Sequence, residues 1–101
     1  MAVKVVLCCA NGFTTTMLCK KIREEAEKQG LEMEVGAWPM TELDSAASDA
    51  DVILLGPQVR FNLQKVKKAY PDKPVLLIDS RALAFIDGAA VLEQIKSELD
   101  K

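Results

Sequence analysis

The sequence contains no histidine, and this absence excludes several kinds of chemistry at once. A Cys-His or Ser-His dyad cannot be assembled, because the general base of such a pair is missing. The chain also lacks the ligand set of a zinc site, since it has three cysteines, no Cys-x-x-Cys spacing and no histidine. We therefore expect no metal and no cofactor, and any nucleophile must be activated by the backbone or by a partner protein.

Three other features are scarce. Charge is nearly balanced at −2, and no basic run is longer than the two residues of Lys67-Lys68, which gives little support to nucleic-acid binding. No apolar run approaches the roughly 20 residues that span a bilayer. Lys4 interrupts the first apolar stretch, so no signal peptide is indicated and a cytoplasmic location is expected. An odd number of cysteines argues against a disulfide framework.

The pattern of apolar residues predicts a single α/β domain over residues 1–101. Residues 3–8, 51–56 and 75–78 are apolar runs typical of buried parallel strands, and 32–37 alternates like a half-exposed edge strand. Helical spacing covers 14–29, 59–69 and 87–99, with a short helical piece after Thr41. The expected fold is a four-stranded parallel open sheet of order 2-1-3-4, with helices on both faces in three layers.

The most informative segment runs from a strand through a cysteine and a glycine into three threonines. Cys9 ends the strand, Ala10, Asn11, Gly12 and Phe13 form a loop, and Thr14, Thr15 and Thr16 open a helix. Unpaired N–H groups and the helix dipole bind phosphate at such a place. The same field favours thiolate over thiol. Cys9 is therefore a candidate nucleophile beside a phosphate cradle.

Each of these residues also has a plain structural interpretation. Cys9 can be a small buried hydrophobe, as we expect for Cys8 in the strand and Cys19 in the helix. At least one of the three threonines is expected to cap the helix, and the functional interpretation is that one or two also donate hydrogen bonds to phosphoryl oxygens. Phe13 either faces a partner protein or folds back over the core.

The neighbouring strands end at the same edge, where ligands bind in doubly wound sheets. Pro57 and Gln58 follow one strand, and Asp79 follows the next. Asp79 is expected to cap a turn, because an anion would repel phosphate. Arg60 and Arg81 are candidate counter-charges or partner contacts.

Three blocks of the sequence resemble one protein family in order and spacing. They are Cys9-Ala-Asn-Gly-Phe-Thr-Thr-Thr16, Asp51-Val-Ile-Leu-Leu-Gly-Pro-Gln-Val-Arg60, and Val75-Leu-Leu-Ile-Asp-Ser80 followed by Asp87-Gly88. Together they are similar to the IIB component of the phosphoenolpyruvate-dependent sugar phosphotransferase system, in its lactose/cellobiose class. The resemblance covers nearly the whole chain. Its fold also resembles low-molecular-weight tyrosine phosphatases, whose loop ends in an arginine where Thr15 and Thr16 stand here.

The resemblance implies a phosphocarrier. Cys9 would accept a phosphoryl group from a phosphohistidine of the IIA component, with Phe13 on the docking face. It would pass the group to a sugar bound by the membrane-embedded IIC component. A β-disaccharide such as lactose, cellobiose or chitobiose is the expected sugar. Leu83-Ala84 and Phe61 depart from the family's usual tyrosine-glycine and tyrosine, so the sugar is not assigned by similarity.

Two other functions compete with this interpretation. A cysteine-dependent phosphatase would use the same loop, but it needs a loop arginine and an acid such as Asp79 or Asp87 in reach. A receiver-like regulatory module would carry acidic residues at the end of the first strand, where this chain has cysteines.

Overall fold

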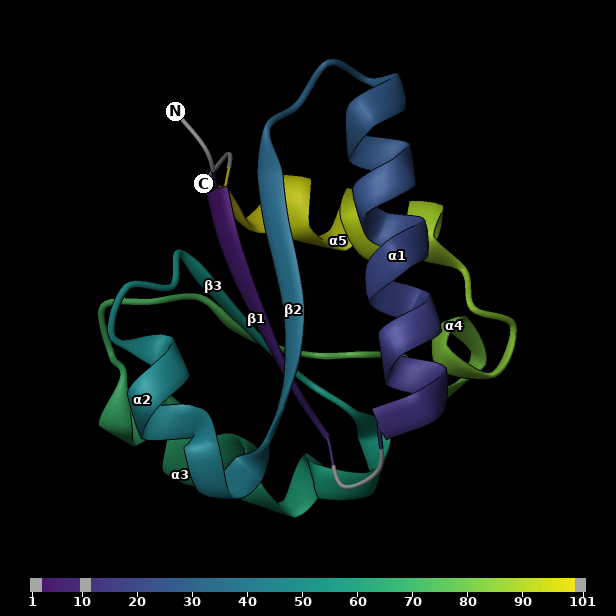
Figure 1. Cartoon of the computed structure of the whole chain (residues 1–101). Helices are drawn as coiled ribbons and strands as arrows, with labels where there is room; N and C mark the ends of the chain where they lie inside the picture. Colours follow the sequence, from purple (N-terminus) through teal and green to yellow (C-terminus); the bar gives the residue numbers. More distant parts are fainter. Residues whose placement is uncertain (1–2, 10–11, 100–101) are drawn as a thin grey trace.

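The sheet has the predicted composition and strand order. The computed structural model describes residues 3–9 and 12–99 (Figure 1). Its four strands are β1 (Val3–Cys9), β2 (Met33–Pro39), β3 (Val52–Leu55) and β4 (Val75–Leu77). They are parallel and lie in the order β2-β1-β3-β4, which confirms the fold expected from the alternation of strands and helices.

Helices connect the strands and cover both faces of the sheet. They are α1 (Gly12–Lys28), α2 (Leu43–Ala47), α3 (Leu63–Ala69), α4 (Ser80–Ala84) and α5 (Gly88–Leu99), with 3₁₀ turns η1 (Met40–Glu42) and η2 (Pro57–Asn62). Figure 1 shows α1, α4 and α5 on one side of the sheet and α2 and α3 on the other. The three-layer arrangement is therefore confirmed.

Two helical predictions need correction. Residues 59–69 are not one helix, because Pro57 starts a 3₁₀ turn and Val59 leaves helical geometry at φ −114°, so the α-helix begins only at Leu63. The helix α4 was not predicted at all. It is only five residues long, too short to show helical periodicity.

The core is divided between the two faces by the alternation of side chains along β1. Val5 and Leu7 pack with Leu18, Ile22 and Ile95 under α1 and α5. Val6 and Cys8 point the other way, into a second cluster under α2 and α3. Because β3 is buried on both faces, it reads as a continuous apolar run, as parallel strands do.

The inward face of α5 differs in part from the one that helical spacing predicts, which is Ala90, Val91, Ile95 and Leu99. Gly88, Val91, Leu92 and Ile95 are its buried residues, whereas Ala90 is exposed and Leu99 is 39% exposed. The close approach of α1 to α5 at Gly88 explains which side of α5 faces inward. A Cβ at Gly88 would lie 2.6 Å from the backbone carbon of Lys21, so only glycine lets the two helices meet there.

The ends of the helices agree with the sequence in two places and disagree in one. The sequence favours Asp87 as an N-cap and Gly30 as the residue that stops the first helix, and both predictions are confirmed: the Asp87 carboxylate accepts from the Ala90 N–H at 3.1 Å, and Gly30 adopts φ +73° after α1. The sequence also offers Thr41 or Ser45 as the cap of the short helix α2, and this prediction is wrong. Its N-cap residue is Glu42, which makes no side-chain capping bond.

Candidate phosphate site at the carboxyl edge of the sheet

Cys9 lies in the middle of the carboxyl edge of the sheet. Its backbone is the last residue of β1 and pairs with Pro39 of β2. On the other side, the Gly56 N–H donates to the Cys8 carbonyl oxygen at 2.8 Å, which brings the end of β3 beside Cys9. The residue predicted to react therefore stands between the ends of two flanking strands, at the reversal of strand order where parallel sheets bind ligands.

The connection from Cys9 to α1 is very short. The helix begins at Gly12, two residues earlier than predicted, so Gly12 and Phe13 belong to its first turn and not to the loop. The expectation that one of the threonines caps the helix is therefore wrong, because all three lie inside α1. The first turn of α1 carries no acidic side chain that would oppose an anion. The predicted loop residues Ala10 and Asn11 lie outside the described residues. The side chains of Cys9, Phe13 and Thr14 are likewise not described, so their roles stay predictions.

The two remaining threonines occupy different environments. Thr15 is buried, with 1% of its surface exposed, whereas Thr16 is exposed. Both are among the residues that the sequence placed around a phosphoryl group. Thr16 is the one whose side chain faces solvent, where an incoming group arrives.

The other two cysteines are structural. Cys8 belongs to the core under α2 and α3, and Cys19 lies in the core under α1 with 2% of its surface exposed. Both were expected to be buried and inert, and their burial is confirmed.

Beyond the ends of β3 and β4, Asp79 has the structural role that the sequence predicts. Its carboxylate accepts from the Arg81 N–H at 3.2 Å and caps α4, so it is a structural cap. Pro57 is half-buried at the start of η2, and the side chain of Gln58 is not described. The guanidinium groups of Arg60 and Arg81 are exposed, and neither makes an ion pair within residues 3–9 and 12–99.

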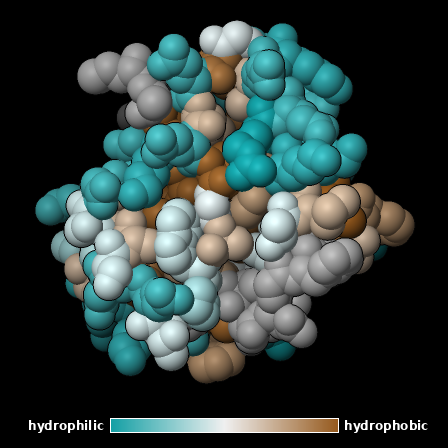
Figure 2. Space-filling view, viewed as in Figure 1, coloured by the Kyte–Doolittle hydropathy of each residue, from teal (hydrophilic) through white to brown (hydrophobic). Residues whose placement is uncertain are grey.

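Sequence reasoning missed two exposed aromatic residues in the segments that follow β3 and β4. Phe61, in η2 after β3, is 79% exposed, and Phe85, directly after α4, is 80% exposed. Figure 2 shows brown and tan side chains protruding at its right edge, over the position where Figure 1 places α4. The signal in the sequence was a phenylalanine in each segment that follows an apolar strand.

Shifted pKa values occur away from this edge. A hydrogen bond to Asp44, 2.6 Å from the hydroxyl, raises the pKa of Tyr70, and hydrogen bonds from Lys4 and Ser48 lower the pKa of Asp49. Among the described residues, no group of histidine, cysteine, aspartate and glutamate side chains is arranged to hold a metal.

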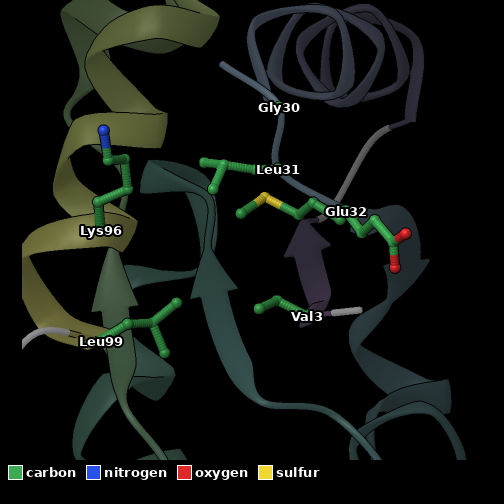
Figure 3. Close-up of a pocket in the computed structure, with 7 residues that line it drawn as sticks. Val3, Gly30, Leu31, Glu32, Lys96 and Leu99 are labelled. Atoms are coloured by element: carbon green, nitrogen blue, oxygen red, sulfur yellow. The ribbon is translucent and has the colours of Figure 1, made fainter. Parts of the chain in front are cut away.

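A cavity of about 490 Å³ opens at the opposite, amino end of the sheet (Figure 3). Val3, Leu31, Met33 and Leu99 supply its apolar lining, and Lys96 and Glu32 stand at its border. It is separated from Cys9 by the length of β1, so it is not part of the candidate phosphate site.

A family model described as PTS system, lactose/cellobiose specific IIB subunit, matches residues 4–94. The chain belongs to this family. It is 34% identical to the oligo-beta-mannoside-specific EIIB component of Bacillus subtilis, over 93% of both chains. It is also 36% identical to the galactose-specific and cellobiose-specific EIIB components of two Lactococcus lactis subspecies, in each case over 67% of this chain and 68% of the relative.

Solved structures have the same fold. The lactose-specific IIB domain from Streptococcus pneumoniae superposes with a TM-score of 0.84 at 18% identity, covering 96% of this chain and 97% of that one. The cellobiose-specific IIB protein from Borrelia burgdorferi gives 0.74 at 27% identity, covering 92% and 87%. No helix in the described part of the chain is long and apolar enough to cross a membrane.

Membership establishes the coarse activity. The protein is a IIB phosphocarrier of the lactose/cellobiose class, hence a component of a sugar phosphotransferase, and the family implies IIA and IIC partners in general. The relatives' names include three different sugars, so the sugar does not follow from the family.

Proposed function

We propose that Cys9 carries the phosphoryl group between the IIA and IIC components. The observation that supports this most is the position of Cys9 at the end of the central strand β1, three residues before the start of α1. The backbone N–H groups that open a helix have no intrahelical partners, so they are available to phosphoryl oxygens.

The absence of histidine determines where the donor lies. No imidazole exists in this chain to serve as a base or as a phosphoryl donor. In the proposed step, the Cys9 thiolate attacks the phosphorus of a phosphohistidine on IIA. The new P–S bond forms as the P–N bond breaks, and the released imidazole retains the electron pair and takes up a proton. Positioning and electrostatic stabilisation then supply most of the catalysis.

The loop residues have supporting roles in this proposal. The backbone amides of Ala10, Asn11 and Gly12, together with those of Phe13 and Thr14 in the first turn of α1, hold the equatorial oxygens. Among the threonines we assign the hydroxyl contact to Thr16, because its side chain is exposed and that of Thr15 is buried. The next acceptor is a sugar hydroxyl presented by IIC on the cytoplasmic side, and we propose a β-disaccharide as that sugar.

The direct test is mass spectrometry after incubation with phosphoenolpyruvate, the general phosphotransferases and a lactose/cellobiose-class IIA component. We expect one added phosphoryl group on the peptide that contains Cys9, and none in Cys9→Ser. Cys19→Ala is the matched control, because it removes a buried thiol of α1 and should leave labelling intact. Labelling of Cys9→Ser at the wild-type level would overturn the proposal.

A second assay separates this function from that of a phosphatase. A carrier should show no steady turnover of an aryl phosphate, since Asp79 is engaged as the cap of α4 and is not a free acid. Sustained hydrolysis that depends on Cys9 would favour the phosphatase instead.

A further inference from the structure

Two phenylalanines are unusually exposed: Phe61 lies in η2, which follows β3, and Phe85 directly follows α4, the helix after β4. Phe61 and Phe85 expose 79% and 80% of their surface, about twice the values of 38% and 39% for Leu31 and Leu99 at the amino end. Phenylalanine in water carries a large apolar cost, because burying such a side chain contributes about 1.5–3 kcal/mol. Exposed rings in the segments that follow two neighbouring strands are typical of a protein interface.

The turn that follows Phe85 contains an isoleucine in a backbone conformation that isoleucine normally avoids. The next residue, Ile86, has φ +51°, in the left-handed region where a β-branched residue is a rare outlier. The Asp87 N–H donates to the Ala82 carbonyl oxygen at 2.8 Å, and the Ile86 N–H donates to that of Leu83 at 3.2 Å. This is the Schellman pattern, which glycine usually completes.

The isoleucine side chain compensates for that conformation. Ile86 is partly buried and packs against the core under α1 and α5. Strain of about 1–2 kcal/mol is thus opposed by apolar burial, and the turn is anchored on one side while Phe85 projects on the other. Strained backbone of this kind is retained mainly where function needs a fixed geometry.

The segment that follows β3 carries an excess of positive charge. Although the net charge is −2, residues 56–71 contain four cationic side chains and no acidic one. Arg60 precedes Phe61, and Arg81 lies one turn before Phe85. Neither guanidinium forms an ion pair in the described structure, while the nearby carboxylates of Asp79 and Asp87 accept from backbone N–H groups.

We infer that Arg60, Phe61, Arg81 and Phe85 form the docking surface for the phosphorylated IIA component. We call these four residues the aromatic rim. The inference rests on the proposed function of Cys9, because η2 and α4 follow the carboxyl ends of β3 and β4, at the edge of the sheet where β1 also ends. Arginine and aromatic residues dominate binding energy in interfaces, and unpaired cations next to them attract an anionic partner.

Charge favours the donor over the acceptor as the occupant. Phosphorylated IIA brings a phosphoryl group to this edge, and its negative charge is attracted by Arg60 and Arg81. Once the group has moved to Cys9, the donor loses that charge and the attraction weakens, which helps it to leave. The acceptor sugar is neutral and gains nothing comparable from the two arginines.

The test compares two half-reactions with one set of variants. The first is the initial rate of phosphoryl transfer from a phosphorylated lactose/cellobiose-class IIA component that labels the wild-type chain. Its kcat/KM should fall about 10- to 30-fold in Phe61→Ala and in Phe85→Ala, with kcat within about threefold. The kcat/KM of Arg60→Glu and of Arg81→Glu should fall further at low salt. Raising the salt concentration from about 0.05 to 0.5 M should reduce the difference in kcat/KM between these variants and the wild type.

The amino end supplies matched controls. Leu31→Ala and Leu99→Ala remove exposed apolar side chains, and Lys28→Glu makes the same change of charge on an exposed residue. All three should keep wild-type rates. Thermal unfolding of each rim variant should stay near wild type, because the altered side chains are exposed.

The second half-reaction is transfer from prephosphorylated protein to sugar in vesicles that contain a IIC component. Unchanged donor kinetics in all four rim variants would overturn the inference even if Cys9 is labelled normally. Loss confined to transfer into the vesicles would also overturn it, because the rim would then face IIC. Absence of label on Cys9 in the wild-type chain would instead overturn the proposed function itself.

Discussion

The two ends of the sheet treat their charged side chains differently. At the amino end, Lys73 donates to the carbonyl oxygens of Ala47, Ser48 and Ala50, and Lys4 pairs with Asp49 at 3.1 Å. At the carboxyl end, Arg60 and Arg81 have no ionic partner among the described residues.

The difference shows what each end contributes. Internal partners at the amino end close the termini of helices and strands, so these lysines stabilise the fold. Cations without internal partners contribute little to stability and remain available to another molecule. The two ends also differ in shape. The amino end has an open cavity, whereas the aromatic rim has a strained turn and exposed rings.

The largest effect on stability is expected where α5 meets α1. Gly88→Ala would place a Cβ 2.6 Å from the backbone of Lys21 and should lower the free energy of unfolding by about 2–3 kcal/mol. Gly30→Ala, at the amino end, meets no atom within 4 Å and should cost only about 1 kcal/mol through its φ of +73°. Urea unfolding of both variants measures the difference, and equal losses would contradict the close approach.

Lys73→Met tests the amino end directly. Removing the ammonium leaves the carbonyl oxygens at the end of α2 without their charged donor, and we expect a loss of about 1–2 kcal/mol. The rate of phosphoryl transfer should not change. Wild-type stability of this variant, or slower phosphoryl transfer, would contradict the claim that the amino end contributes to stability and not to transfer.

Substitutions of Thr15 and Thr16 test which of these two residues contacts the phosphoryl group at the carboxyl end. Thr16→Val should slow phosphoryl transfer about three- to tenfold at wild-type stability, because the residue is exposed and its hydroxyl is the proposed contact. Thr15→Val should act mainly on stability, by about 1 kcal/mol, since its side chain is buried. Transfer kinetics and thermal unfolding, measured on both variants, decide the assignment; the reverse pattern would transfer the role to Thr15.

The smallest effect concerns the contact between α2 and α3. Tyr70 donates to Asp44, and this bond raises the tyrosine pKa above its ordinary value of 10.0. The folded state therefore retains the proton more strongly, so the stabilisation is complete below pH 10 and is lost as pH rises through the folded-state pKa. Tyr70→Phe should cost about 0.5–1 kcal/mol at pH 7 and less above that range. Unfolding at pH 7 and 11 checks this, and a cost that grows with pH would contradict it.

Much of the architecture could be predicted because it follows from local rules. The apolar runs that contain Val5 and Ile53 predict buried parallel strands, and the strand order 2-1-3-4 follows from one half-exposed edge strand. Asp87 and Gly30 marked helix ends because capping depends on a few neighbouring residues. The cysteine loop was recognisable because its residues are contiguous.

The sequence by itself determined the fold class, the family and the candidate nucleophile Cys9, since these depend on periodicity and on contiguous motifs. Only the tertiary structure decided that Thr15 is buried and Thr16 exposed, that α5 turns Gly88 toward α1, and that Phe85 projects from a strained turn. Those features arise from packing between segments far apart in the chain. Burial and close approach depend on that packing, and no local pattern encodes it.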